Sequence, residues 1–197
     1  MSLQARCTEH PSAWIGHIPF AHWLGLTLQP DCFVELGTHY GHSFFNLCEG
    51  IKQSGASSTC YAVDTWTGEP QARHNPEDIF DFVSKRQQED YSETATLLRM
   101  TFEEAREKFE PEGIQLLHFN GHHSYESVSQ DFHKWKSLLR PNATVLFHDT
   151  QVRKFEFGVW KFWRELCESY ECHFEFLHSR GLGVLQLSTS AEHPLNP

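Results

Sequence analysis

Short, largely apolar runs, each followed directly by polar or charged residues, recur along most of this chain of 197 residues. The runs are Phe33–Leu36, Thr59–Val63, Thr96–Met100, Ile114–Phe119 and Thr144–Phe147. Short apolar runs bounded by turn signals are typical of buried strands, and the segments between these runs place apolar residues at helical spacing. Strands that alternate with helices form a parallel sheet, whose carboxyl ends meet at one edge. The polar residues after the runs are therefore expected to line one crevice.

The end of the chain departs from this alternation. Two more strands are predicted at Cys172–Leu177 and Gly183–Leu187, and only His178–Leu182 joins them. A link this short cannot cross over to a parallel strand, so the pair must form an antiparallel hairpin. The predicted fold is α/β, with a single Rossmann-like, doubly wound, mostly parallel seven-stranded sheet that ends in this hairpin.

The helices between the strands are predicted from apolar spacing and capping signals. They are expected at Ser43–Lys52, Glu77–Glu89, Thr101 to about Phe109, Tyr125 to Pro141, and Val159–Tyr170. Asn75 followed by Pro76 is a helix start, and Thr101 with Glu104 forms a capping box. Residues 1–30 are interpreted as an aromatic helical lead-in or lid, 31–188 as one domain, and 189–197 as a disordered tail.

Composition narrows the class of function. The formal net charge is -10 at pH 7, which disfavours nucleic acid as a partner because such partners require basic patches. The cysteines form no C-x-x-C pair and are expected to be reduced thiols, so we expect a cytoplasmic protein. No apolar run reaches membrane-spanning length, so no membrane insertion is expected. A small-molecule or saccharide acceptor is the expected partner, and a homo-oligomer stays open.

The turn after the first run constrains the ligand most. Glu35 ends the run, and Gly37 and Gly41 let the backbone turn sharply and be approached closely. This spacing is neither G-x-G-x-x-G nor a phosphate loop, so a pyrophosphate ligand and a nicotinamide-dependent oxidoreductase are disfavoured. A carboxylate suits a ligand with hydroxyls or an amine. The alternative is a plain strand-turn-helix corner whose glycines serve packing alone.

Asp64 ends the second run, one strand-helix-strand unit after Glu35. A carboxylate at this position commonly accepts both hydroxyls of a ribose, and the two acids are expected to face the same crevice. The alternative is that Asp64 only caps the segment Thr65–Gly68.

Taken in order, these motifs resemble the class I S-adenosylmethionine-dependent methyltransferases. Within that class the chain looks most like the methyltransferase domain family often associated with bacterial polysaccharide or glycosyl-transfer proteins. The segments that carry the resemblance are Val34–Ser43, Tyr61–Trp66, Gly121–Glu126, Leu146–Thr150, Phe157–Trp160 and Gly181–Leu185. The similarity runs from about Trp14 to Leu187.

The resemblance implies S-adenosylmethionine as the cofactor and assigns residues to it. Glu35, Gly37 and Gly41 would hold the methionine end, Asp64 the ribose, and Trp66 would lie near the adenosine. The other residues that the resemblance places at the cofactor are Thr38, Tyr40, Ser43, Met100, Thr101, Phe102 and Asn120. The implied reaction is O-methylation of a small-molecule or sugar hydroxyl.

A hydroxyl acceptor must lose its proton, and His123, His148 and Asp149 are the catalytic candidates at the sheet edge. His123 is favoured as the base because it heads the helix after the fourth strand and imidazole titrates near neutral pH. The alternative is that His123 caps its helix or packs.

Asn120 departs from the pattern of related small-molecule O-methyltransferases, which place an aspartate there and hold a divalent cation. A neutral amide is a poor ligand for Mg²⁺, so an obligatory metal is disfavoured. If a metal binds, its candidate ligands are Asn120, His122, His148 and Asp149. Asn120 also opens the alternative function, a module that binds the cofactor but is catalytically impaired.

Overall fold

A computed structural model describes residues 5, 8–67 and 75–187. The strands are β1 (Cys32–Leu36), β2 (Thr59–Asp64), β3 (Ala95–Arg99), β4 (Ile114–Phe119), β5 (Leu139–His148), β6 (His173–Phe176) and β7 (Leu182–Gln186). The helices are the 3-10 helices η1 (Ala13–His17) and η2 (Lys136–Leu138), and α1 (Ile18–Leu28), α2 (His42–Ser54), α3 (Pro76–Asp90), α4 (Phe102–Arg106), α5 (Tyr125–Trp135) and α6 (Val159–Ser169). The expected tail at 189–197 lies outside the described residues.

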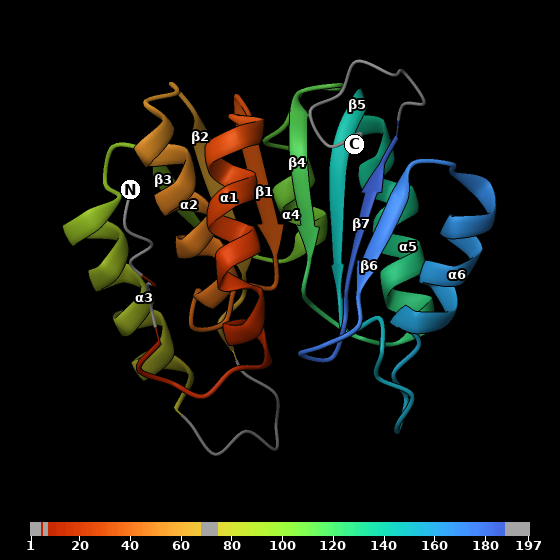
Figure 1. Cartoon of the computed structure of the whole chain (residues 1–197). Helices are drawn as coiled ribbons and strands as arrows, with labels where there is room; N and C mark the ends of the chain where they lie inside the picture. The colour runs from red at the N-terminus through yellow and green to blue at the C-terminus, as the bar shows by residue number, and fades with distance from the viewer. Residues whose placement is uncertain (1–4, 6–7, 68–74, 188–197) are drawn as a thin grey trace.

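The strands form one seven-stranded sheet in the order β3-β2-β1-β4-β5-β7-β6 (Figure 1). The pairs from β3 to β5 are parallel, whereas β7 pairs antiparallel with both β5 and β6. The chain order reverses between β1 and β4, the kind of switch point at which ligands bind in open α/β sheets. The predicted fold class and the closing hairpin are thus confirmed.

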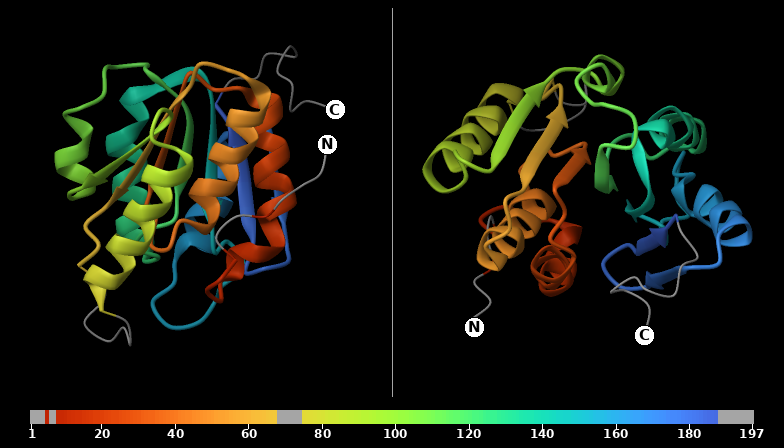
Figure 2. Two further views of the ribbon diagram at one scale, coloured as in Figure 1. Left: turned by 90° about the vertical axis from the view of Figure 1, so that its left-hand side faces the viewer. Right: turned by 90° about the horizontal axis from the view of Figure 1, so that it is seen from above.

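Helices cover both faces of the sheet, which gives three layers (Figure 2). One core cluster joins α1, α2 and α3 to the sheet, and the other joins α4, α5 and α6 to its opposite face. Alternation along the strands supplies both clusters: Phe33 belongs to the first, and its neighbours Val34 and Leu36 belong to the second. Among the described residues, no helix is long and apolar enough to cross a membrane.

The helix starts follow local chemistry. The Asn75 side chain accepts from the Glu77 N–H, with Pro76 at the first helical position of α3. Thr101 and Glu104 form the complete capping box at α4. These starts were predicted, while α4 ends at Arg106, earlier than the expected Phe109.

The prediction was wrong from Leu139 to Ala143, which belong to β5. The helix from Tyr125 ends at Trp135, and β5 begins at Leu139 and runs through Pro141. The pairing with β4 shifts here, because Ile114 pairs with Leu139 while Leu116 pairs with Thr144. The residues in between bulge from the ladder, which lets the strand accommodate a proline without an N–H donor.

The N-terminal aromatic segment is part of the core. Trp14, Ala21 and Leu24 are buried within the cluster that α2 also joins. Helices α1 and α2 touch backbone to backbone, since a Cβ at Gly50 would lie 2.1 Å from the carbonyl oxygen of His22. In Figure 1 the two helices run side by side in front of the sheet.

Candidate active site

The turn after β1 is built around Gly37. Its φ is +89°, and a Cβ there would lie 2.5 Å from the Cα of Gly121 and 2.6 Å from the Asn120 carbonyl oxygen. Only glycine therefore allows the ends of β1 and β4 to come this close. The Asn120 side chain donates to the Gly37 carbonyl at 3.2 Å and closes the turn. The glycine turn and the end of β4 form one unit.

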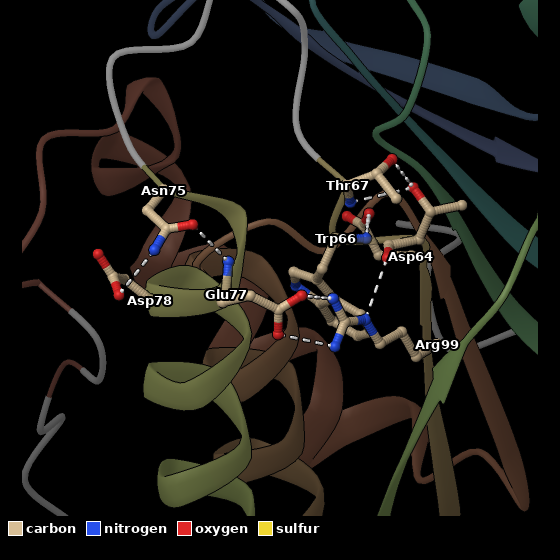
Figure 3. Close-up of polar contacts among 8 residues, drawn as sticks. Asp64, Trp66, Thr67, Asn75, Glu77, Asp78 and Arg99 are labelled. Atoms are coloured by element: carbon tan, nitrogen blue, oxygen red, sulfur yellow. Dashed lines mark hydrogen bonds and ion pairs between the residues drawn. The ribbon is translucent and has the colours of Figure 1, made fainter.

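Asp64 anchors the ends of β1 and β2 to each other. One carboxylate oxygen accepts from the His39 N–H at 2.9 Å, and the other accepts from the Trp66 N–H at 2.8 Å. Each oxygen retains a further lone pair, so the carboxylate can still accept from two hydroxyls. The predicted capping role and a ligand-binding role are thus compatible. The Trp66 contact is drawn in Figure 3.

A wall beside Asp64 links β3 to the start of α3. Arg99 makes a two-pronged ion pair with Glu77 and donates from Nε to the Thr65 carbonyl at 3.4 Å (Figure 3). The Arg99 guanidinium also lies over the Phe80 ring at 4.4 Å, and Phe80 packs against Trp66. These contacts tie Thr65 and Trp66, which follow β2, to β3 and α3.

Three non-glycine residues at the candidate site have left-handed backbones. They are His39 (φ 49°), Trp66 (φ 45°) and Asp149 (φ 65°), which follow β1, β2 and β5. Such conformations cost energy for residues with a Cβ and concentrate at functional sites. The strained positions therefore lie at the carboxyl edge of the sheet, where the sequence predicts the site.

Asp149 connects two of the catalytic candidates. One of its carboxylate oxygens lies 3.2 Å from Nδ1 of His123 and 3.2 Å from Nδ1 of His148. Burial disfavours the charged carboxylate, but the His148 hydrogen bond and the nearby His123 and Arg180 outweigh it and lower the pKa of Asp149. His123 is 29% exposed and stacks on Phe157, whereas His148 is buried. The predicted trio is brought together.

Glu35 is arranged differently from the prediction that it faces the crevice beside Asp64. Its carboxylate is fully buried, and Oε2 lies 2.6 Å from Nδ1 of His118 on β4. The other oxygen, Oε1, has no hydrogen-bond partner among the described residues. Glu35 therefore belongs to the buried layer beneath the turn, with Oε1 as an acceptor that no described residue satisfies.

The remaining predicted cofactor residues occupy different surroundings. Phe102 lies against Gly121, where an added Cβ would be 2.6 Å from its ring, and beside it Met100 is half-buried and Thr101 caps α4. Phe102, Gly121 and His122 line a small hollow with Phe119, His123, Val128, Asp131 and Val159.

Four further candidates are buried. Trp66 packs inward, and its indole N–H donates to the His39 carbonyl at 3.0 Å. Tyr40 stacks on His10 at the start of the chain, with ring centroids 3.9 Å apart. Thr38 and Ser43 are also buried, and Thr38 Oγ1 has no partner among the described residues. Their backbone positions, rather than exposed side chains, place them at the turn.

Within the described ranges, no group of three or more His, Cys, Asp or Glu residues is arranged to hold a metal ion. Of the four metal candidates, His148 and Asp149 contact each other and Asn120 bonds to Gly37. His122 lines the small hollow that Asp131 and His123 also line.

Sequence reasoning missed the layer under η1. Trp14 lies 4.9 Å from His118 and 5.6 Å from His148 between ring centroids, and His17 lies 5.9 Å from His148. The His17 ring bonds to the Ser179 carbonyl, and the His178 ring bonds to the Gly16 carbonyl, so η1 is fastened to the turn between β6 and β7. The available signal was that His118, two residues before Asn120, falls on the same face as Glu35.

A family model described as "Methyltransferase domain" matches residues 34–150, from β1 to the end of β5. This match covers more than half of the chain. The chain belongs to this methyltransferase family. The matched range contains Gly37, Asp64, His123 and Asp149, and the fold is that of the class I methyltransferases.

One curated relative is similar to this chain over most of its length. An uncharacterized protein of Sinorhizobium fredii is 42% identical over 174 residues, which are 88% of this chain and 19% of the relative. The methyltransferase chain thus spans about a fifth of the curated relative it matches.

Solved structures match over nearly the whole domain at low sequence identity. The O-methyltransferase from Bacillus cereus in complex with SAH has a TM-score of 0.65 and 12% identity, over 93% of this chain and 86% of that one. TomG from Streptomyces achromogenes, an O-methyltransferase involved in tomaymycin synthesis and solved with SAM, has a TM-score of 0.64 and 13% identity, over 88% and 80%. A Corynebacterium glutamicum protein has a TM-score of 0.66 and 13% identity, over 93% and 85%. At this identity the likeness concerns the fold alone.

Proposed function

We propose that this domain binds S-adenosylmethionine and methylates a hydroxyl group of a small molecule or sugar. The observation that carries the proposal is the placement of the His123–Asp149 pair at the same sheet edge as the Gly37 turn and Asp64. One part can hold a cofactor, and the other can accept a proton. The B. cereus and TomG structures, solved with SAH and SAM, support the choice of cofactor.

The residues at the turn fit this cofactor. The Gly37 backbone permits close approach, the open lone pairs of Asp64 suit ribose hydroxyls, and Glu35 Oε1 is a buried acceptor without a partner among the described residues. Glu35 Oε1 suits the ammonium group at one end of the cofactor, and Asp64 suits the ribose in its middle.

The chemistry divides between cofactor and protein. When bound, S-adenosylmethionine supplies a methyl group on a positively charged sulfur, so transfer depends chiefly on alignment and on exclusion of water. His123 would accept the proton of the acceptor hydroxyl at Nε2. Asp149 accepts from Nδ1–H of His123, which fixes this tautomer and stabilises the imidazolium once it forms.

Calorimetric titration with S-adenosylmethionine tests the first step. Wild-type protein should bind the cofactor. Asp64→Asn and Asp64→Ala should weaken binding, because the ribose hydroxyls would no longer have a carboxylate to donate to. His123→Ala is the matched control, since it lies in the proton-transfer part and should leave the affinity unchanged. No detectable binding, or affinity indifferent to Asp64, would contradict the proposal.

Mass spectrometry of products from a panel of hydroxylated small molecules and sugars tests the second step. His123→Ala should lower the rate by about 10²- to 10⁴-fold, the usual contribution of a general base. Cofactor binding without any product across the panel would instead support the impaired module. Asn120 favours that alternative in one respect, because its amide is engaged with the Gly37 carbonyl.

A further inference from the structure

Glu35 and His118 form a fully buried pair directly beneath the glycine turn. They are register partners on the adjacent parallel strands β1 and β4, and both side chains are 0% exposed. Their contact of 2.6 Å joins Oε2 of Glu35 to Nδ1 of His118. Glu35 is two residues from Gly37 and His118 is two residues from Asn120, the two residues that close the turn.

When Glu35 is a carboxylate it can only accept, so the arrangement that satisfies this contact places the proton on His118 Nδ1. Burial lowers the pKa of His118 although the bond to Glu35 opposes this effect, so the surroundings favour the neutral ring. A neutral imidazole leaves the negative charge of an ionised Glu35 uncompensated. No Lys or Arg among the described residues forms an ion pair with Glu35.

Burying a carboxylate without a cationic partner costs free energy of folding, and an oxygen without a hydrogen bond adds to that cost. Glu35 Oε1 is such an oxygen, and it has no hydrogen-bond partner within the described part of the chain. The group that would complete it is a small cation with N–H donors. The cofactor of the proposed function carries this group, an ammonium, at its methionine end.

We infer that His118 is a positioning residue, which fixes the Glu35 carboxylate so that Oε1 accepts from the ammonium group of the cofactor. This inference rests on the proposed function. A neutral donor at His118 holds the carboxylate without cancelling its charge, whereas a lysine or arginine at that place would compete with the ligand. His118 would therefore determine affinity for the amino-acid end of the ligand and leave its nucleoside end unaffected.

Two ligands separate the two ends. S-adenosylhomocysteine carries the ammonium group, whereas methylthioadenosine has the same nucleoside and thioether but lacks the amino-acid part. In calorimetric titrations His118→Leu should weaken S-adenosylhomocysteine binding by about 10- to 100-fold, as expected for loss of a hydrogen bond that orients a charged group. Binding of methylthioadenosine should not change.

His118→Asn is the rescue variant. An asparagine amide can donate to Glu35 from nearly the position of Nδ1, so most of the affinity for S-adenosylhomocysteine should return. His133→Leu, a change of an exposed histidine on α5 that bonds to the Ser129 carbonyl, is the matched control and should affect neither ligand. Glu35→Gln keeps the side-chain volume and should reproduce the selective loss if His118→Leu fails to fold.

The outcomes are distinct. Equal losses for both ligands, or no loss for either, would overturn the role of His118 while leaving the proposed function intact. Failure of the wild-type protein to bind S-adenosylhomocysteine would overturn the proposed function and the inference with it. Selective loss with rescue by His118→Asn would establish the positioning role.

Discussion

Asp149 holds two imidazole rings with one carboxylate oxygen, from a backbone with φ of 65°. Its negative charge favours the Nδ1–H tautomer of each ring, which leaves Nε2 as the acceptor. In the proposed reaction this carboxylate therefore favours the tautomer in which His123 presents Nε2 to the acceptor hydroxyl.

We expect Asp149→Asn to shift His123 toward the Nε2–H tautomer, because an amide can turn its N–H toward the ring. The NMR chemical shifts of the His123 imidazole nitrogens measure the tautomer without any acceptor. Arg180→Gln is the control, since Arg180 is 60% exposed and lies 3.9 Å from the other Asp149 oxygen. An unchanged His123 tautomer in Asp149→Asn would show that the carboxylate does not set it.

The sequence predicts which residues lie at the candidate site, but not which of them contact one another. His123 and Asp149 were predicted as catalytic candidates because each follows a strand, and the structure brings them to 3.2 Å. The contact of His118 with Glu35 was not predicted, although the strand that carries His118 was. Its partner Glu35 is distant in sequence, and only the register of β1 on β4 brings the two together.

The element that covers the polar layer is η1, and its last residue is a buried histidine. His17 bonds through Nε2 to the Ser179 carbonyl. Burial, together with the neighbouring His148 and His178, lowers the pKa of His17 from 6.5 to about 4, and His118 adds to this effect. The ring is thus neutral in the folded protein over a range of pH in which it would be charged in the unfolded chain.

The free energy of unfolding should therefore fall as the pH drops from about 6.5 toward 4. The unfolded chain binds more protons in this window, so acid favours unfolding. His17→Gln keeps a donor for Ser179 but does not titrate, and it should make the dependence shallower. Urea titrations across this window measure the slope. His133→Gln should retain the wild-type slope, and an equally steep slope in His17→Gln would contradict the assignment to His17.

Elements with local signals were the most predictable. The starts of α3 and α4 follow from Asn75–Pro76 and from the Thr101 capping box, which are complete within a few residues. The predicted start of β5 was wrong because no local signal marks it. A proline such as Pro141 normally ends a helix or strand. Here the shifted pairing with β4 keeps Pro141 within the strand.

The whole molecule is one body of three layers, in which the N-terminal segment packs as core. Gly50 on α2 faces the carbonyl oxygen of His22 on α1, and Gly25 on α1 faces that of Leu47 on α2. The backbones of α1 and α2 therefore contact each other at both glycines, and these contacts set the distance between the two helices.

We expect Gly50→Ala to lower the free energy of unfolding by about 1–3 kcal/mol, because the added methyl forces α1 and α2 apart. The reason is steric, since alanine is otherwise the better helix former. Gln88→Ala, at an exposed position of α3, is the control and should change stability by less than about 0.5 kcal/mol. Thermal or urea unfolding measures both, and a stabilised Gly50→Ala would contradict the close contact.

Strand β7 occupies the place between β5 and β6, although it follows both in the chain. Synthesis runs from the N-terminus, so residues 182–186 emerge from the ribosome last of the strands. Until then β5 is an edge strand with one side unpaired and β6 has no neighbouring strand. Exposed edge strands can pair with strands of other molecules. Until β7 appears, the backbone groups of β5 on that side are therefore open to pairing with a strand of another molecule.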